Sequence, residues 1–144
     1  IEKEKNNNFR AKAKKLNSGI EIFQIIKGNG AKPIEGDEIF FYYEGYLAMN
    51  GVLFGTNRKE IMITYDTYSA VDESKGWYEP SKITYSDEMK LIEGFKEALM
   101  TMNLGDKLYV YIPSEMGYGE RAMGNRIPAN SNLEFIIELV DISN

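Results

Sequence analysis

Cysteine and histidine are both absent from the 144 residues of the sequence. Disulfides, cysteine nucleophiles and Ser-His-Asp catalysis are therefore excluded, and zinc loses its usual ligands. Apolar runs are also short, and none reaches the ~18 residues that indicate a membrane-spanning helix. The missing cysteines do not fix the redox compartment, because a domain of this size can be stable without disulfides. We expect neither a metal nor a cofactor.

Charge is distributed unevenly along the chain. Residues 1–16 carry six basic and two acidic groups, whereas the whole chain has a net charge of −5, so the remainder is strongly acidic. The basic residues form no continuous stripe with interleaved aromatics, which argues against nucleic acid as the main partner. Three consecutive asparagines and few apolar positions predict that residues 1–18 are a charged linker or a short helical arm. A basic arm that touches a membrane surface is the alternative.

Apolar and aromatic residues gather in short runs that have the density of β-strands. These runs are residues 20–27, 38–47, 52–54, 107–112 and 133–142, with Ile83 and Tyr85 as further strand residues. Residues 38–47 are partly apolar on both alternating faces, so we expect this strand to be central in its sheet. Asn50-Gly51 is a dipeptide typical of tight hairpins, which would bring Phe54 opposite residues 42–44.

One segment has the spacing of an amphipathic helix. Apolar residues recur at helical intervals from Leu91 to Met102, the acidic run Ser86-Asp87-Glu88 offers a start, and Gly105 ends the pattern. Residues 56–82 have no clear period; 60–65 could be an extra strand, and we treat the whole stretch as an insertion. Several strands around a single helix predict an α+β domain with an antiparallel sheet wrapped on one helix.

The loop between the last two predicted strands is unusually long. Its glycines flank Tyr118, and loops of this length in a small domain are mostly functional or disordered, so we expect it to form the rim of a pocket. Residues 117–122 match the G-x-G-x-x-A spacing of dinucleotide-binding loops. That motif requires a strand leading directly in and a helix leading out, and residues 113–116 and 125–128 permit neither. We therefore reject a dinucleotide site.

Four ordered motifs resemble the FKBP-type peptidyl-prolyl cis-trans isomerases. They are YYEGYL at 42–47, GVLF at 51–54, LIEGFKEALMTMNLGDK at 91–107 and IPSEMGYGERAMGNRIPANSNLEFIIELVDI at 112–142. Together they extend the resemblance over about residues 19–142, and several motifs in order are more specific than any one of them. The resemblance implies an FKBP-like α+β fold, in which an antiparallel β-sheet half-wraps around one short α-helix. Residues 19–144 would form this domain, with the insertion at about 56–82.

The resemblance also implies an apolar active site lined by aromatic residues. The catalytic residues it assigns are Tyr43, Phe54, Phe95, Tyr118 and Phe135, and the substrate-binding residues are Leu91, Ile92, Ile127, Ile83 and Tyr85. In this assignment Phe95 forms the floor, where the family often has Trp, and Tyr118 donates a hydrogen bond from its hydroxyl. The backbone N–H of Ile92 faces a substrate carbonyl.

Two features depart from the family pattern. Gly55 stands where an acidic residue usually follows the hairpin Phe, so the site lacks one polar partner. The insertion at 56–82 is also much longer than the usual bulge, and it holds the single tryptophan, Trp77. This segment would either overhang the pocket or cover another part of the sheet.

The leading functional hypothesis is a prolyl isomerase that accelerates rotation of Xaa-Pro bonds and assists protein folding. A non-catalytic FKBP-like binding or chaperone module is the main alternative. A hydrolase that uses two carboxylates is a much weaker hypothesis, because no pair of acidic residues in the sequence has a convincing placement. Proline-containing polypeptides are the expected partners, a macrolide is a candidate ligand, and we expect a monomer. A Lys/Asn-rich leader resembles the stalk of envelope members, which favours the periplasm or cell envelope, with membrane contact only through a lipid anchor upstream. A cytoplasmic location is the alternative.

Overall fold

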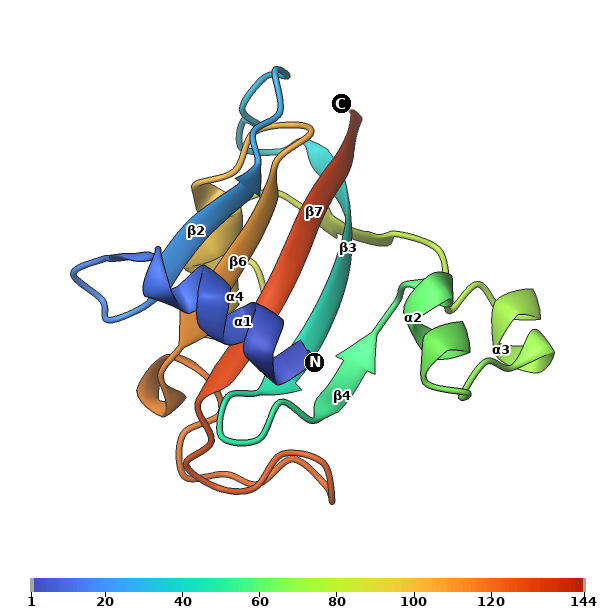
Figure 1. The fold of residues 1–144 in the computed structure, drawn as a ribbon. Helices are drawn as coiled ribbons and strands as arrows, with labels where there is room; N and C mark the ends of the chain where they lie inside the picture. Colours follow the sequence, from blue (N-terminus) through green and yellow to red (C-terminus); the bar gives the residue numbers. More distant parts are fainter. Residues whose placement is uncertain (1, 144) are drawn as a thin grey trace.

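Seven antiparallel strands form one sheet that curves around helix α4 (Figure 1). The structure is a computed structural model and describes residues 2–143. Its strands are β1 (Lys14–Lys15), β2 (Glu21–Ile26), β3 (Glu38–Leu47), β4 (Leu53–Thr56), β5 (Ser81–Thr84), β6 (Lys107–Ile112) and β7 (Leu133–Ser143). Its helices are α1 (Glu2–Ala11), α2 (Lys59–Thr64), α3 (Ala70–Ser74), α4 (Glu93–Met100) and the 3₁₀ turn η1 (Ser114–Met116). The predicted α+β class with an antiparallel sheet around one short helix is confirmed.

Strand β3 lies in the interior of the sheet, as predicted. The strand order is β1-β2-β6-β7-β3-β4, and β5 pairs with the other half of the same β3 edge as β4. Alternation along β3 directs Ile39 and Phe41 into the main core, where both are buried. The bounds of β3 and β6 are those expected from the sequence.

Helix α4 packs on the concave face of the sheet through Phe95, Ala98 and Leu99, which are all buried. Gly94 permits this close approach, because a Cβ atom at that position would lie 2.5 Å from the side chain of Ile112. Larger residues would push the helix off β6. The helix therefore has a fixed height above the sheet, and with it the ring of Phe95.

The start of α4 differs from the prediction. The helix begins at Glu93, whereas Ser86-Asp87-Glu88 was expected to start it. The Ser86 hydroxyl does accept a hydrogen bond from the amide of Glu88, at 3.1 Å, but within a local turn. A serine side chain makes the same short-range hydrogen bond in a turn as at a helix N-cap. The sequence pattern therefore could not distinguish this turn from the start of the helix.

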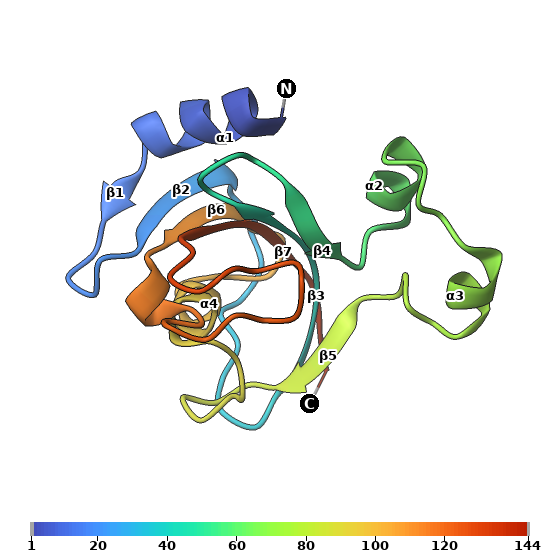
Figure 2. The ribbon, with the colours of Figure 1, turned by 90° about the horizontal axis from the view of Figure 1, so that it is seen from below.

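Helix α1 in the N-terminal segment packs on the sheet. The ring of Phe9 in α1 lies 5.9 Å from that of Phe23 and 5.7 Å from that of Tyr109, on the convex face of the sheet. The guanidinium of Arg10 lies 3.6 Å from the ring centre of Tyr111 and donates two hydrogen bonds to Glu21. Figure 2 shows α1 on the opposite side of the sheet from α4. In this segment the structure has helix α1 over Glu2–Ala11, followed by the short strand β1.

The insertion leaves the sheet after β4 and returns at β5. Residues 60–65, considered as an extra strand, lie largely in helix α2, and α3 follows in the stretch that showed no period. Figure 2 shows both helices standing away from the sheet beyond the ends of β4 and β5. Neither helix has a buried residue, which explains why no amphipathic pattern marked them.

Candidate active site

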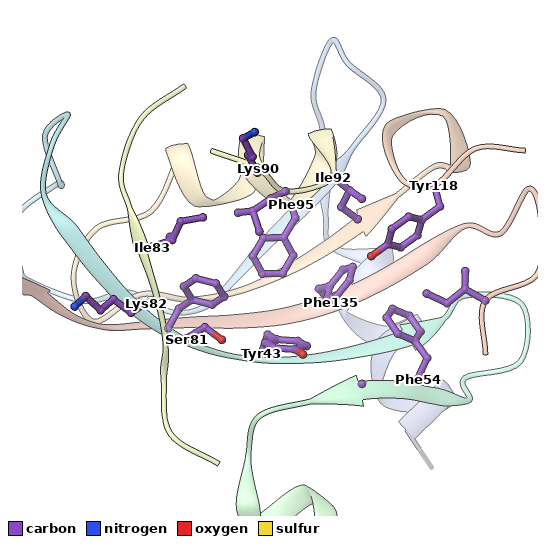
Figure 3. A pocket seen from close by; sticks show the side chains of 14 residues that line it. Tyr43, Phe54, Ser81, Lys82, Ile83, Lys90, Ile92, Phe95, Tyr118 and Phe135 are labelled. Carbon is purple, nitrogen blue, oxygen red and sulfur yellow. The ribbon is translucent and has the colours of Figure 1, made fainter. Parts of the chain in front are cut away.

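A pocket of about 720 Å³ opens on the concave side of the sheet, beside the N-terminal end of α4 (Figure 3). Its walls come from β3, β4, β5, β7, α4 with the residues just before it, and the loop after β6. The lining residues are Phe41, Tyr43, Phe54, Gly55, Ser81, Lys82, Ile83, Lys90, Leu91, Ile92, Phe95, Tyr118, Ile127 and Phe135. Nine of the ten predicted site residues are among them, so segments far apart in the chain do meet at one cavity.

Tyr85 is the predicted site residue that does not line the pocket. Strand β5 ends at Thr84, and Tyr85 instead joins the turn at residues 34–37 through backbone bonds with Gly36 and Asp37. Its ring is buried in the core. Burial also raises the pKa of the Tyr85 hydroxyl. The strand register after the insertion could not be predicted from the sequence. Tyr85 was therefore assigned to the pocket, whereas it lies in the core.

The floor and walls are a cluster of aromatic rings packed edge to face. The ring of Phe135 lies 5.0 Å from that of Phe95 at 89° and 5.5 Å from that of Phe54 at 85°. Tyr43 meets Phe95 at 6.3 Å and 85°. Such pairs are each worth ~0.5–1.5 kcal/mol beyond burial, so the rings support one another's orientation.

A bulge in the hairpin brings Phe54 into this cluster. Gly45 pairs with Gly55 and Tyr46 pairs with Leu53, so Phe54 is the extra residue opposite the Gly45–Tyr46 step. The sequence had placed it opposite residues 42–44, which is wrong, because the observed pairing puts Phe54 nearer the hairpin end of β3. A Cβ on Gly45 would lie 2.7 Å from the rings of both Phe54 and Phe135, so only glycine leaves room for them.

Two phenol hydroxyls serve the pocket. Tyr118 points its hydroxyl inward from the loop, and Tyr43 lies across the cavity from it (Figure 3). Burial, with a smaller contribution from Tyr118, raises the pKa of Tyr43, so the Tyr43 hydroxyl remains a neutral donor at ordinary pH. A Cβ on Gly55 would lie 3.8 Å from the Tyr43 hydroxyl, which locates the absent acidic side chain beside this group. Among residues 2–143, no protein group accepts a hydrogen bond from either hydroxyl, so both can bind a ligand.

The long loop after β6 is held over the pocket by its own hydrogen bonds. The amide of Gly119 donates to the carbonyl of Ser114 at 2.8 Å, and Gly119 has a positive φ of 60° that favours glycine. Further along, Arg126 donates to the carbonyl of Phe54 at 3.1 Å, which ties the loop to the opposite wall. Ile127 beside it is 5% exposed and lines the cavity. The loop that was predicted to form the pocket rim is thus held over the pocket by hydrogen bonds within the loop and to Phe54.

Charged chemistry is scarce at the site. Lys82 and Lys90 are the charged lining residues, and their amino groups point away from the rings (Figure 3). Lys82 also pairs with Glu38 at 3.3 Å. Within the described chain, residues 2–143, no group of acidic side chains is arranged to hold a metal ion. The arrangement offers an apolar enclosure and hydrogen-bond donors, and it offers no general acid, general base or nucleophile.

Four lining residues were missed by the sequence reasoning. Phe41 could have been found, since it shares the inward face of β3 with Tyr43. Ser81 and Lys82 lie where the insertion returns, and no pattern in the sequence marked that register. Lys90 precedes the predicted pair Leu91 and Ile92, but a lone lysine gives no signal of its own.

Comparison with known proteins agrees with the geometry. The family model of the FKBP-type peptidyl-prolyl cis-trans isomerases matches residues 29–140, which is most of the chain. The chain belongs to this family. FK506-binding protein 1 of Aspergillus oryzae is 30% identical over 133 residues, which cover 87% of this chain and 99% of that protein. The FKBP-type 22 kDa isomerase of Escherichia coli is 33% identical over 125 residues, covering 87% of this chain and 50% of that protein.

Solved FKBP-type structures share the fold. The crystal structure of FkpA from Escherichia coli superposes with a TM-score of 0.68 at 25% identity, covering 99% of this chain and 59% of that one. A peptidyl-prolyl isomerase from Pseudomonas syringae gives a TM-score of 0.67 at 25% identity, covering 98% of this chain and 92% of that one. The half-wrapped sheet described above is therefore the FKBP fold, and the chain is a peptidyl-prolyl isomerase of this type.

Proposed function

We propose that this FKBP-type isomerase rotates Xaa-Pro peptide bonds inside the aromatic pocket. The proposed catalytic residues are Tyr43, Phe54, Phe95, Tyr118 and Phe135. The observation that supports the proposal is an apolar aromatic bowl that also contains the hydroxyls of Tyr43 and Tyr118. Among residues 2–143, neither hydroxyl donates a hydrogen bond to another protein group. A site without acid, base or nucleophile suits a reaction in which no covalent bond breaks. Rotation about an amide is such a reaction.

The physical basis is the loss of resonance in a twisted amide. A planar amide resists rotation with a barrier of ~18–20 kcal/mol because its C–N bond has double-bond character. Cis and trans Xaa-Pro differ by only ~0.5–1 kcal/mol, so a catalyst has to stabilise the twisted state. The twisted amide carries less charge separation than the planar one. An apolar bowl therefore disfavours it less than it disfavours the ground state.

Each wall has a role in this scheme. Phe95 supports the proline ring from below, while Phe54 and Phe135 grip it from the sides. Tyr118 donates to a carbonyl that flanks the proline, and the N–H of Ile92 holds another. Ile92 is the N-cap of α4, so this amide belongs to a helix start whose first N–H groups have no partner within the helix. Fixed orientation of the substrate contributes to the rate.

Substrate binding falls to the residues at the pocket edge. Leu91 and Ile83 would contact side chains next to the proline, and Ile127 would cover the bound segment. Proline-containing polypeptides are the proposed substrates. A macrolide is the proposed small-molecule ligand, since relatives are named for binding FK506. Gly55 leaves Tyr43 without an acidic neighbour, which favours weaker binding of ligands that need an acceptor there.

A second function is a polypeptide-binding module without catalysis. Gly55 favours it, because the site has lost a polar partner that family members usually hold. An assay of cis-to-trans conversion in a proline tetrapeptide, coupled to a protease specific for the trans form, separates the two. The isomerase accelerates the slow phase in proportion to enzyme concentration. A pure binder suppresses aggregation of an unfolding protein and leaves that phase unchanged.

Assistance to protein folding, a monomeric state and a location in the cell envelope remain predictions. Among residues 2–143, none of the helices is long and apolar enough to cross a bilayer. A stalk at residues 1–16 was the basis for the envelope location, and part of that stretch is helix α1 on the sheet. Determining the gene sequence upstream of Ile1 tests the location, and light scattering tests the monomer.

A further inference from the structure

A second groove adjoins the active site. It has a volume of about 370 Å³ and is bounded by the two ends of the insertion, with Met62, Trp77, Tyr78 and Pro80 as its apolar walls. Tyr43 and Ser81 line both this groove and the aromatic pocket. The two cavities therefore adjoin at these two residues.

Asn57 fixes the groove to the sheet. Its side-chain Nδ2 donates to the carbonyl of Phe41 at 3.0 Å and to the Ser81 hydroxyl at 3.1 Å, and its Oδ1 accepts from the amide of Tyr43. The same Nδ2 lies 3.4 Å from the carbonyl of Glu79. The side chain thus bonds the edge of β3 in the gap between β4 and β5. Both ends of the insertion are anchored at this one buried residue.

The outer wall is ordered by contacts inside the insertion. Tyr68 and Tyr78 stack with ring centres 5.7 Å apart, and the Tyr78 hydroxyl accepts from the amide of Ser69 at 3.1 Å. Ser69 caps α3 through a hydrogen bond from Asp72, at 3.2 Å. Trp77 nevertheless remains 60% exposed. A large aromatic side chain on an anchored support, open to solvent, is a feature of binding surfaces.

We propose that the groove binds the apolar part of the substrate polypeptide that adjoins the Xaa-Pro bond in the pocket. The two lining residues that the cavities share, Tyr43 and Ser81, favour this occupant, and the walls of Met62, Trp77 and Pro80 favour apolar or aromatic side chains. The inference rests on the proposed function, because the chain must enter the groove from a bound proline. It assigns the insertion to substrate selection: long substrates gain contacts that a tetrapeptide cannot make.

The single tryptophan makes the proposal directly measurable. Trp77 is the source of all indole emission, and removal of water from its ring shifts that emission to shorter wavelength. Two twelve-residue peptides without tryptophan serve as probes. Both contain Ala-Leu-Pro-Phe, with Leu and Phe residues added before it in one and after it in the other. The tetrapeptide Ala-Leu-Pro-Phe is the control ligand.

We expect at least one long peptide to give a saturable blue shift that the tetrapeptide does not give. Absence of a shift with both long peptides overturns the proposal. A blue shift that grows with protein concentration in the absence of peptide assigns the groove to a second copy of the chain, and also overturns it. If the tetrapeptide is isomerised while no peptide shifts Trp77, the groove inference fails and the proposed function stands. If nothing is isomerised, the proposed function fails by itself.

A matched pair of variants tests the groove by kinetics. Trp77 and Val71 are both about 60% exposed, at 60% and 61%, and Val71 does not line the groove. Trp77→Ala is expected to lower kcat/KM for the responsive long peptide five- to tenfold relative to that for the tetrapeptide. Val71→Ala is expected to leave this ratio unchanged. Equal ratios in the two variants contradict a role for the groove.

Discussion

The Oδ1 atom of Asn57 accepts a hydrogen bond from the backbone amide of Tyr43 at 2.8 Å. Asn57 lies at the start of the insertion, and Tyr43 lines the aromatic pocket. This hydrogen bond therefore links the insertion directly to the candidate active site. The same side chain donates to the carbonyl of Phe41 at 3.0 Å. An asparagine amide therefore occupies the place of a strand residue between β4 and β5.

Asn57→Ala should lower the free energy of unfolding by about 2–4 kcal/mol, since it leaves buried donors and acceptors of β3 unpaired. Chemical denaturation of both proteins measures the loss. Asn50→Ala is the control, because Asn50 also accepts a backbone bond, from Val52 at 3.0 Å, but at an exposed turn where water can replace it. Equal losses in the two variants would show that the Asn57 network adds nothing to an ordinary turn contact.

Gly45→Ala should damage the pocket without touching a substrate. Its Cβ would lie 2.7 Å from the rings of Phe54 and Phe135, so both walls must move. Overpacking of this kind costs about 1–3 kcal/mol of stability, and displaced rings should reduce kcat/KM about tenfold or more. Gly55→Ala is the control, because its added Cβ meets nothing closer than 3.8 Å. Isomerase activity of Gly45→Ala equal to that of this control would refute the packing argument.

Gly55→Asp should restore a polar partner beside Tyr43. The position has room for a side chain, and a carboxylate there can accept from the Tyr43 hydroxyl and offer a second acceptor position to a ligand. Affinity for a hydroxyl-bearing macrolide should rise about tenfold, which corresponds to ~1.4 kcal/mol. Isothermal titration of wild type, Gly55→Asp and Gly55→Ala measures it. No gain over Gly55→Ala would mean that the missing carboxylate does not limit binding.

The stability of the fold should depend on pH through Glu134, beneath helix α1. Tyr109 donates a hydrogen bond to Glu134, and burial raises the pKa of this carboxyl, although Tyr109, Lys3 and Arg10 oppose the rise. A raised pKa in the folded state means that this contribution to stability is complete below the unfolded value of ~4.3 and is lost as pH rises through the folded value. Asn6, fully buried nearby on α1, carries no charge.

Glu134→Gln removes that titration and keeps an acceptor for Tyr109. We therefore expect the difference in unfolding free energy between Glu134→Gln and wild type to shift in favour of the variant as pH increases above ~4.3. Urea unfolding from pH 4 to 8 follows this difference, with the exposed Glu120→Gln as control. A constant difference over the whole range would contradict a raised pKa for Glu134.

The sequence predicted the parts of the site that depend on regular alternation and on ordered motifs. Tyr43 and Phe135 were assigned to the site through the family resemblance, and the structure places them on strands β3 and β7, where both line the pocket. Phe54 was assigned to the right wall with the wrong partner. It lies opposite the Gly45–Tyr46 step as the extra residue of a bulge, and a bulge leaves no trace in the composition.

The packing of α1 on the sheet, and the helices α2 and α3, were the parts that sequence reasoning did not predict. Helix α1 consists mostly of polar residues. It contacts the sheet through the ring of Phe9, which packs against Phe23 and Tyr109. A single aromatic residue in a charged segment gives no periodic signal. Helices α2 and α3 bury no residue, so the only evidence for them lay in three dimensions.

The most direct test of the proposed site is the isomerisation rate of one proline tetrapeptide with wild type, Tyr118→Phe and Phe135→Leu. Circular dichroism of each variant should first match wild type, which confirms the fold. The account predicts about a five- to tenfold lower kcat/KM for Tyr118→Phe, equal to the loss of one hydrogen bond of ~1–1.4 kcal/mol, and a larger loss for Phe135→Leu. Wild-type rates in both folded variants would contradict it.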